Sequence, residues 1–85
     1  MNEPIRVMIA DDHPMFRKGL SMLLMSLPNF QIVAEAEDGA QVVPLALQHQ
    51  PDVILMDVQM PELNGIEATR QIMHQSPHIR VLILT

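Results

Sequence analysis

The chain has 85 residues, of which 48% are hydrophobic, and it carries a net charge of −5 with no cysteine. This length allows one domain, over residues 1–85, and the aliphatic share is that of a globular core rather than of a disordered chain. The five basic residues are scattered, which argues against direct nucleic-acid binding. No segment is apolar enough to span a membrane. The absence of cysteine suits the reducing cytoplasm.

The first predicted elements are a strand and an amphipathic helix. Residues 5–10 are apolar except for Arg6 and are rich in β-branched side chains, which predicts a strand. Pro14 suits the first turn of a helix, where its missing N–H costs nothing. The helix repeats apolar residues at helical spacing: Phe16, Leu20, Leu23, Leu24 and Leu27. We expect this face to pack on a sheet, while Arg17, Lys18 and Ser21 face solvent.

The next strand and helix each contain a residue that conflicts with the local pattern. Residues 31–37 predict a second strand, and the charged Glu35 inside it favours a position at the edge of a sheet. Residues 40–50 predict a helix, but Pro44 in a helix interior would cost about 3 kcal/mol. We therefore expect this helix to start late, with Pro44 in its first turn, or to be kinked there.

The most apolar stretch of the chain leads into a single carboxylate. Residues 53–56 are Val, Ile, Leu and Met, and Asp57 follows them directly. The stretch lies between Pro51 and Pro61, so it predicts a short strand that is buried on both faces. Such a strand would place Asp57 where the core ends.

A third helix and a fourth strand follow. Asn64 can cap the helix, Glu67 completes a capping-box-like pair, and a Ser-Pro pair ends the helix. Four helix residues are expected to face inward: Ile66, Thr69, Ile72 and Met73. Residues 79–84 predict the last strand, which ends at Thr85.

Strands that alternate with helices favour right-handed crossovers and a parallel sheet that is covered on both faces. The second strand has the features of an edge, whereas the others are apolar throughout. We therefore predict a flavodoxin-like α/β fold whose doubly wound parallel sheet has the strand order 2-1-3-4. The first helix then lies on one face, and the other two helices lie on the opposite face.

Three carboxylates and a hydroxyl follow the strands of this predicted sheet. Asp11 and Asp12 end the first strand, Asp57 ends the third, and Thr85 ends the fourth. Ligands of such sheets bind beyond the carboxyl ends of the strands where the strand order reverses, here between strands 1 and 3. Converging carboxylates repel one another and favour a cation, and oxygen ligands of this kind suit Mg²⁺. Beside Mg²⁺, Asp57 would act as a nucleophile toward a phosphoryl group, with Thr85 as a hydrogen-bond donor.

Simpler interpretations stay open for the single residues. A lone Asp at a strand end is more often a helix cap or a solubilising loop residue. His13 is predicted to be a turn residue rather than a ligand, because the site already has oxygen donors. The glycines, at positions 19, 39 and 65, form neither a G-x-G-x-x-G motif nor a P-loop, which disfavours nucleotide binding.

Five segments carry a resemblance to a known family: residues 7–14, 38–39, 51–61, 64–65 and 81–85. In order and spacing they resemble the receiver domain of bacterial two-component response regulators. Asp-Asp-His-Pro, followed by Phe-Arg-Lys-Gly-Leu at 16–20, is most similar to the LuxR/FixJ-type subfamily with a helix-turn-helix output domain.

The resemblance implies that Asp57 is the phosphoacceptor and takes its phosphoryl group from a sensor histidine kinase. Asp12 would bind Mg²⁺ directly, and Asp11 would act through a metal-bound water or lie close by. The backbone carbonyl of Gln59 would be a further metal ligand, and Thr85 would be the switch hydroxyl. Such a domain is a signalling domain and not an enzyme, apart from self-catalysed phosphorylation and dephosphorylation.

Compared with this family, the chain is expected to be truncated after its fourth strand. The fifth strand with its lysine, two helices and the DNA-binding output domain would be missing, so DNA would be reached only through that absent domain. Residues 81–84 would then form a bare apolar edge, which favours a homodimer or a domain-swapped oligomer.

Two alternative functions stay open. One is a Mg²⁺-dependent aspartyl-phosphate phosphatase or phosphotransferase that uses Asp57 as its nucleophile. Gln59 stands where such an enzyme would carry its general acid, which counts against turnover. The other is a structural dimerisation fragment with a vestigial acidic site.

Overall fold

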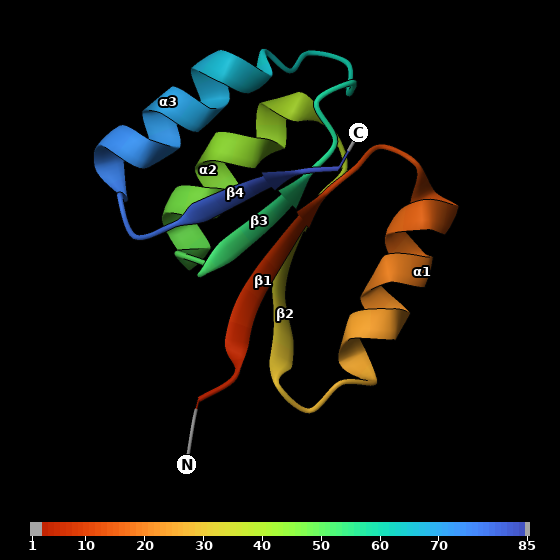
Figure 1. Ribbon diagram of the computed structural model, residues 1–85. Helices are drawn as coiled ribbons and strands as arrows, with labels where there is room; N and C mark the ends of the chain where they lie inside the picture. The colour runs from red at the N-terminus through yellow and green to blue at the C-terminus, as the bar shows by residue number, and fades with distance from the viewer. Residues whose placement is uncertain (1–2, 85) are drawn as a thin grey trace.

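The computed structural model describes residues 3–84 as four strands that alternate with three helices (Figure 1). The strands are β1 (Ile5–Ala10), β2 (Phe30–Ala36), β3 (Val53–Met56) and β4 (Arg80–Ile83). The helices are α1 (Pro14–Met25), α2 (Gly39–His49) and α3 (Gly65–Gln75). None of these helices is long and apolar enough to cross a bilayer.

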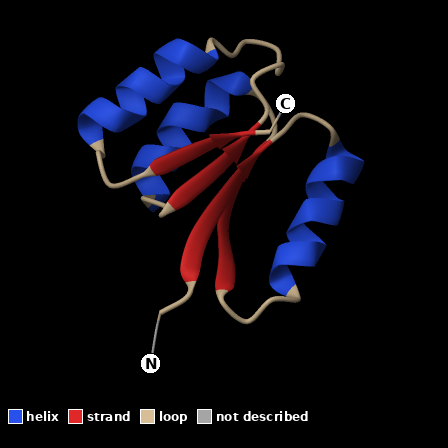
Figure 2. Cartoon of the chain, viewed as in Figure 1, coloured by secondary structure: helices blue, strands red, loops and turns tan. Residues whose placement is uncertain are grey.

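The four strands form one parallel sheet in the order β2-β1-β3-β4. Helix α1 lies on one face of the sheet, and α2 and α3 lie on the other (Figure 2). These observations confirm the predicted fold class and strand order, including the edge position of the strand that contains Glu35. All four strands point in the same direction, so their carboxyl ends meet at one edge of the sheet.

The sheet separates two apolar cores because successive side chains of a strand point to opposite faces. From β1, Met8 and Ala10 enter the core under α2 and α3, where Ile72 is fully buried. Val7 and Ile9 enter the smaller core under α1. Because β1 lies between two other strands and beneath helices on both sides, its last four residues are buried.

Helix α1 buries less of its predicted apolar face than the spacing suggested. Leu24 is buried and Leu20 is partly buried, but Phe16 is 53% exposed and Leu23 and Leu27 are also exposed. Ser21, which was expected to face solvent, is buried. The reason is the position of α1, which packs mainly on β2 and β1 and leaves the β3–β4 half of this face uncovered.

Helix α2 does not start late, and Pro44 lies inside it. Asp38 caps the helix by accepting a hydrogen bond from the Gln41 amide, which fixes the start at Gly39. Pro44 forgoes its hydrogen bond to the carbonyl of Ala40, but both residues are exposed, so water can satisfy that carbonyl. The helix tolerates this proline because Asp38 caps its start and because the carbonyl that lacks a hydrogen bond is exposed to solvent.

Two further burial expectations were only partly correct. In α3, Ile72 is buried and Asn64 caps the helix through the Glu67 amide as predicted, but Ile66 is 77% exposed and Met73 is exposed as well. In β3, side chains that face α2 and α3 are buried, whereas those on the α1 side are only partly buried. Strand β4 is the second edge of the sheet. Apolar side chains are exposed at Leu82 and Ile83 within it and at Leu84 directly after it.

Candidate functional site

The parallel register brings the acidic residues of two strands together. Ala10 of β1 pairs with Met56 of β3, so Asp11 and Asp57 are the next residues on neighbouring strands. The Asp57 amide donates to the carbonyl of Ala10 at 2.9 Å, and the Asp11 amide donates to the carbonyl of Ala36 at 3.1 Å. The backbone therefore holds both residues at the carboxyl edge of the sheet, next to the reversal of strand order.

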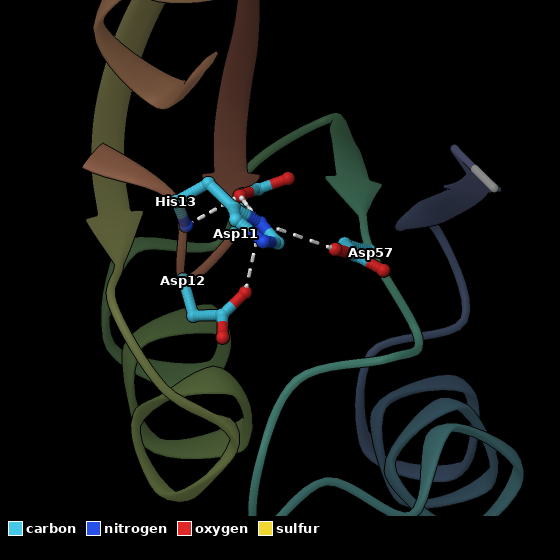
Figure 3. A group of neighbouring side chains, drawn as sticks. All are labelled: Asp11, Asp12, His13 and Asp57. Atoms are coloured by element: carbon cyan, nitrogen blue, oxygen red, sulfur yellow. Dashed lines mark hydrogen bonds and ion pairs between the residues drawn. The ribbon is translucent and has the colours of Figure 1, made fainter. Parts of the chain in front are cut away.

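Four side chains meet at this edge (Figure 3). Each of Asp11, Asp12, His13 and Asp57 offers one ligand atom, and these atoms lie within 4.8 Å of one another. Asp11 and Asp57 are buried, Asp12 is partly buried and His13 is exposed. The structure thus brings together the three carboxylates singled out from the sequence and adds an imidazole.

The Asp57 carboxylate is held by one oxygen and open at the other. Its Oδ1 accepts a hydrogen bond from the backbone amide of Gln59 at 2.8 Å, which fixes the rotation of the carboxylate. Its Oδ2 lies 3.9 Å from Nδ1 of His13. Oδ2 is therefore the oxygen that faces the other members of the cluster, as Figure 3 shows.

His13 is part of the cluster, contrary to its expected role as a turn residue only. It occupies the N-cap position of α1 without a side-chain cap bond, and its Nδ1 lies 3.1 Å from Asp11 Oδ1 and 3.1 Å from Asp12 Oδ1. The hydrogen bond to Asp11, the charge of Asp12 and further charge from Asp11 and Asp57 raise the pKa of His13 above 6.5. When it is protonated, the imidazole partly balances the charge of the carboxylates.

Asp12 carries the observation that most favours a cation. Its Oδ1 is buried and has no hydrogen-bond partner within residues 3–84, although Nδ1 of His13 lies 3.1 Å away. A buried carboxylate oxygen without a hydrogen bond is costly unless it binds a proton or a metal ion. Three carboxylates in one cluster supply hard oxygen ligands, so the donor set fits Mg²⁺.

Arg17 also contributes to this edge, although its position in the helix suggested a solvent-facing residue. Its side chain is only 12% exposed. Its Nη1 donates to the backbone carbonyl of Asp11 at 2.7 Å, and the guanidinium also contacts Glu35 and Glu37. The sequence holds one signal for this role, since no lysine or arginine lies between Lys18 and Arg70, and Glu35 and Glu37 therefore need a basic partner from elsewhere in the chain.

The two remaining predicted site residues differ in what is known of their positions. Gln59 lies in the turn after β3. Its backbone amide donates to the Asp57 carboxylate, and its side chain is exposed. Thr85 lies outside the described residues. The strand that leads to it continues its pairing as far as Leu84, whose amide donates to the carbonyl of Met56 at 2.9 Å.

Comparisons with known proteins give a consistent assignment. Residues 7–85 match the model of the response regulator receiver domain. The chain is 46% identical over 81 residues to the transcriptional regulatory protein DegU of Brevibacillus brevis. The matched segment covers 95% of this chain and 34% of DegU. The chain therefore spans about a third of the length of this relative.

Solved structures of receiver proteins have the same fold. The signal receiver domain of the response regulator NarL from Mycobacterium tuberculosis superposes with a TM-score of 0.89 at 36% identity, over 96% of this chain and 66% of that one. A LuxR-family two-component response regulator from Aurantimonas sp. SI85-9A1 superposes with a TM-score of 0.85 at 38% identity, over 95% and 58%.

Proposed function

Because the chain belongs to the family of response regulator receiver domains, we propose that it is a phosphoacceptor signalling domain in which Asp57 receives a phosphoryl group. The observation that carries this proposal is the Asp57 carboxylate, which is held by the Gln59 amide through Oδ1 and directs Oδ2 into a cluster of acids. The donor would be the phosphohistidine of a sensor kinase. A buried, oriented carboxylate oxygen is the type of nucleophile that forms an acyl phosphate.

In the transfer, Asp57 Oδ2 forms a new bond to phosphorus, and the bond between phosphorus and the donor imidazole nitrogen breaks. The leaving imidazole keeps the electron pair and is protonated by solvent. Asp57 Oδ1 remains bonded to the Gln59 amide, which keeps Oδ2 pointed at the incoming group. Backbone hydrogen bonds from β1 and β2 hold the strand ends, so little reorganisation is needed when the donor arrives.

Mg²⁺ is the cofactor of this proposal. Asp12 would bind it directly, Asp11 directly or through water, and Asp57 through a carboxylate oxygen, with the backbone carbonyl of Gln59 as a further ligand. When bound, the ion supplies positive charge against the phosphoryl oxygens. The buried Asp12 Oδ1, which lacks a hydrogen bond among the described residues, supports this ligand set.

Phosphorylation would act through an output domain. DegU, a transcriptional regulator, is about three times as long as the segment that matches, so we propose that a DNA-binding domain outside this chain reads the phosphorylated state. Thr85 would follow the phosphoryl group as the switch hydroxyl. We place the pathway in the cytoplasm, where a kinase and DNA are both accessible.

We also propose that the isolated 85-residue chain associates with a second copy through β4. This strand is a sheet edge with no neighbouring strand on one side among residues 3–84, and Leu82 and Ile83 are 55% and 51% exposed. An apolar edge of this kind is a template for pairing with another chain, either edge to edge or by domain swapping. Light scattering at micromolar concentration should detect a dimer, and a clean monomer would contradict the proposal.

The site favours phosphoacceptance over the two alternative functions. A phosphatase or phosphotransferase needs a general acid near its nucleophile, but the side chain two residues beyond Asp57 is the exposed amide of Gln59. A structural module with a vestigial site would not need to retain three clustered carboxylates, one of them with a buried oxygen that lacks a hydrogen bond within residues 3–84.

The test is incubation with Mg²⁺ and either acetyl phosphate or beryllofluoride, followed by intact mass measurement and ¹⁹F NMR. We expect one stable adduct that the Asp57→Asn variant cannot form. Asp52→Asn is the matched control, because Asp52 lies at the opposite end of β3 and should leave the adduct unchanged. Sustained phosphate release would favour the enzyme alternative, and no adduct at any Mg²⁺ concentration would favour the structural one.

A further inference from the structure

We propose that Arg17 is a positioning residue that fixes the Asp11–Asp12 peptide so that Asp12 is correctly placed for the metal ion. This inference rests on the proposed Mg²⁺ site and assigns to it a residue outside the acidic cluster. Arg17 lies one helical turn into α1 and touches none of the atoms that would bind the ion. Its effect would pass through the backbone of Asp11.

One guanidinium makes three contacts, one with the backbone after β1 and two with glutamates at the end of β2. Its Nη1 donates to the carbonyl of Asp11 at 2.7 Å. Its Nε lies 3.3 Å from Glu35 Oε1, and its Nη2 lies 3.3 Å from Glu37 Oε1. The planar fork of an arginine can satisfy several acceptors in one fixed geometry, which a lysine cannot do.

The three contacts differ in strength. Glu35 and Glu37 are 39% and 69% exposed, and ion pairs at exposed positions contribute little. The bond to the Asp11 carbonyl is short and charge-assisted, and it is made by a side chain that is only 12% exposed. The two glutamates therefore orient the guanidinium, and its hydrogen bond to the carbonyl of Asp11 holds the Asp11–Asp12 peptide in place.

The backbone of Asp11 depends on this bond. Its amide donates to Ala36 in β2, and its carboxylate accepts from the amide of His13 at 2.7 Å. Its carbonyl belongs to the peptide unit that leads into Asp12, and Arg17 is the partner that this carbonyl has. Without Arg17, the plane of that peptide would be held only from its two ends.

Asp12 is the residue most sensitive to such a change. Its Oδ1 has no hydrogen bond to any described residue, and its one close polar contact is with Nδ1 of the exposed His13, so the direction of the carboxylate depends mainly on the backbone. Residues that orient metal ligands from outside the ligand set change metal affinity by about 10- to 100-fold when they are replaced. The peptide that Arg17 holds is the last one before Asp12.

The positioning role and a purely electrostatic role predict opposite effects on Mg²⁺ binding. Arg17 is a cation near an acidic cluster, so removing its charge alone would strengthen the binding of a second cation. Loss of positioning would weaken it. The sign of the change in Mg²⁺ affinity therefore separates the two explanations.

The experiment compares the wild-type chain with Arg17→Met and Arg17→Lys by following backbone amide shifts in NMR titrations with Mg²⁺. We expect Arg17→Met to weaken Mg²⁺ binding about tenfold. Arg17→Lys should also weaken it, because the charge is kept and the fork is lost. Arg70→Met is the matched control, since Arg70 is exposed, pairs only with Glu67 among the described residues and should leave the affinity within about twofold.

A second readout needs no metal. In the Mg²⁺-free protein, hydrogen exchange of the His13 amide should be faster in both Arg17 variants, while the Asp57 amide, which is bonded to Ala10, should keep its rate. If Arg17→Met unfolds, Arg17→Lys supplies both measurements. Unchanged or tighter Mg²⁺ binding in a folded variant, or unchanged exchange at His13, would overturn the proposal. Absence of Mg²⁺ binding in the wild type would instead refute the proposed function, and the exchange rates would still test Arg17.

Discussion

Replacing Gly39 by alanine should destabilise the fold and move the loop that follows Asp57. A Cβ at Gly39 would lie 2.5 Å from the Leu63 backbone nitrogen and 2.6 Å from the carbonyl carbon and oxygen of Glu62. The Gly39 amide also donates to the carbonyl of Pro61 at 3.2 Å, so helix and loop are in direct backbone contact. The added methyl group therefore meets backbone, which cannot rotate away as a side chain can.

The magnitude follows from two opposing effects. Overpacking of a closely packed site costs about 1–3 kcal/mol. Alanine at a helical position regains about 0.5–1 kcal/mol relative to glycine. The net expectation is a loss of about 1–2 kcal/mol in the free energy of unfolding, which corresponds to roughly 4–16 °C in melting temperature for a domain of this size.

Gly19→Ala is the matched control for this substitution. Gly19 lies inside α1, and a Cβ there would meet nothing within 4 Å. Only the gain in helix propensity should remain, so this variant should be more stable than the wild type by about 0.5–1 kcal/mol. Urea unfolding followed by circular dichroism measures both variants under identical conditions. If Gly39→Ala is as stabilising as Gly19→Ala, the close packing of the loop against α2 does not constrain the fold.

Three other predictions concern pH, the core and the exposed edge. The pKa of His13 is raised above 6.5, first by its hydrogen bond to Asp11 and then by the charge of Asp12. Its contribution to Mg²⁺-free stability is therefore fully present below pH 6.5 and is lost as the pH rises through the higher folded-state pKa. Urea midpoints measured above pH 6.5 should fall less steeply in His13→Ala, and parallel pH profiles would contradict this expectation. Ile72→Ala should lower the free energy of unfolding by about 2–5 kcal/mol because Ile72 is fully buried. Ile66→Ala should change the urea midpoint little because Ile66 is 77% exposed. Equal losses of stability in the two variants would refute the packing described for α3. Leu82→Lys should shift the chain from dimer to monomer in light scattering, and an unchanged dimer would exclude β4 as the interface.

Local patterns in the sequence were sufficient for the order and type of the elements. The apolar runs and the proline and glycine positions predicted four strands and three helices, and the polar residue in the second strand predicted its edge position. These features depend on residues that are close together in the sequence, so they can be predicted without the tertiary structure. The convergence of Asp11, Asp12 and Asp57 also followed from strand order, because parallel strands end at one edge.

Only the tertiary structure decided which sides of the elements are covered and which side chains join the acidic cluster. Helical spacing groups Phe16, Leu20 and Leu24 on one side of α1, but the placement of α1 over β2 and β1 decides that only part of this side is buried. The same placement brings Arg17 to the Asp11 carbonyl and turns the His13 imidazole toward Asp12. Periodicity states which residues share a face, whereas contacts between distant segments depend on how the elements pack, and that is a property of the whole chain.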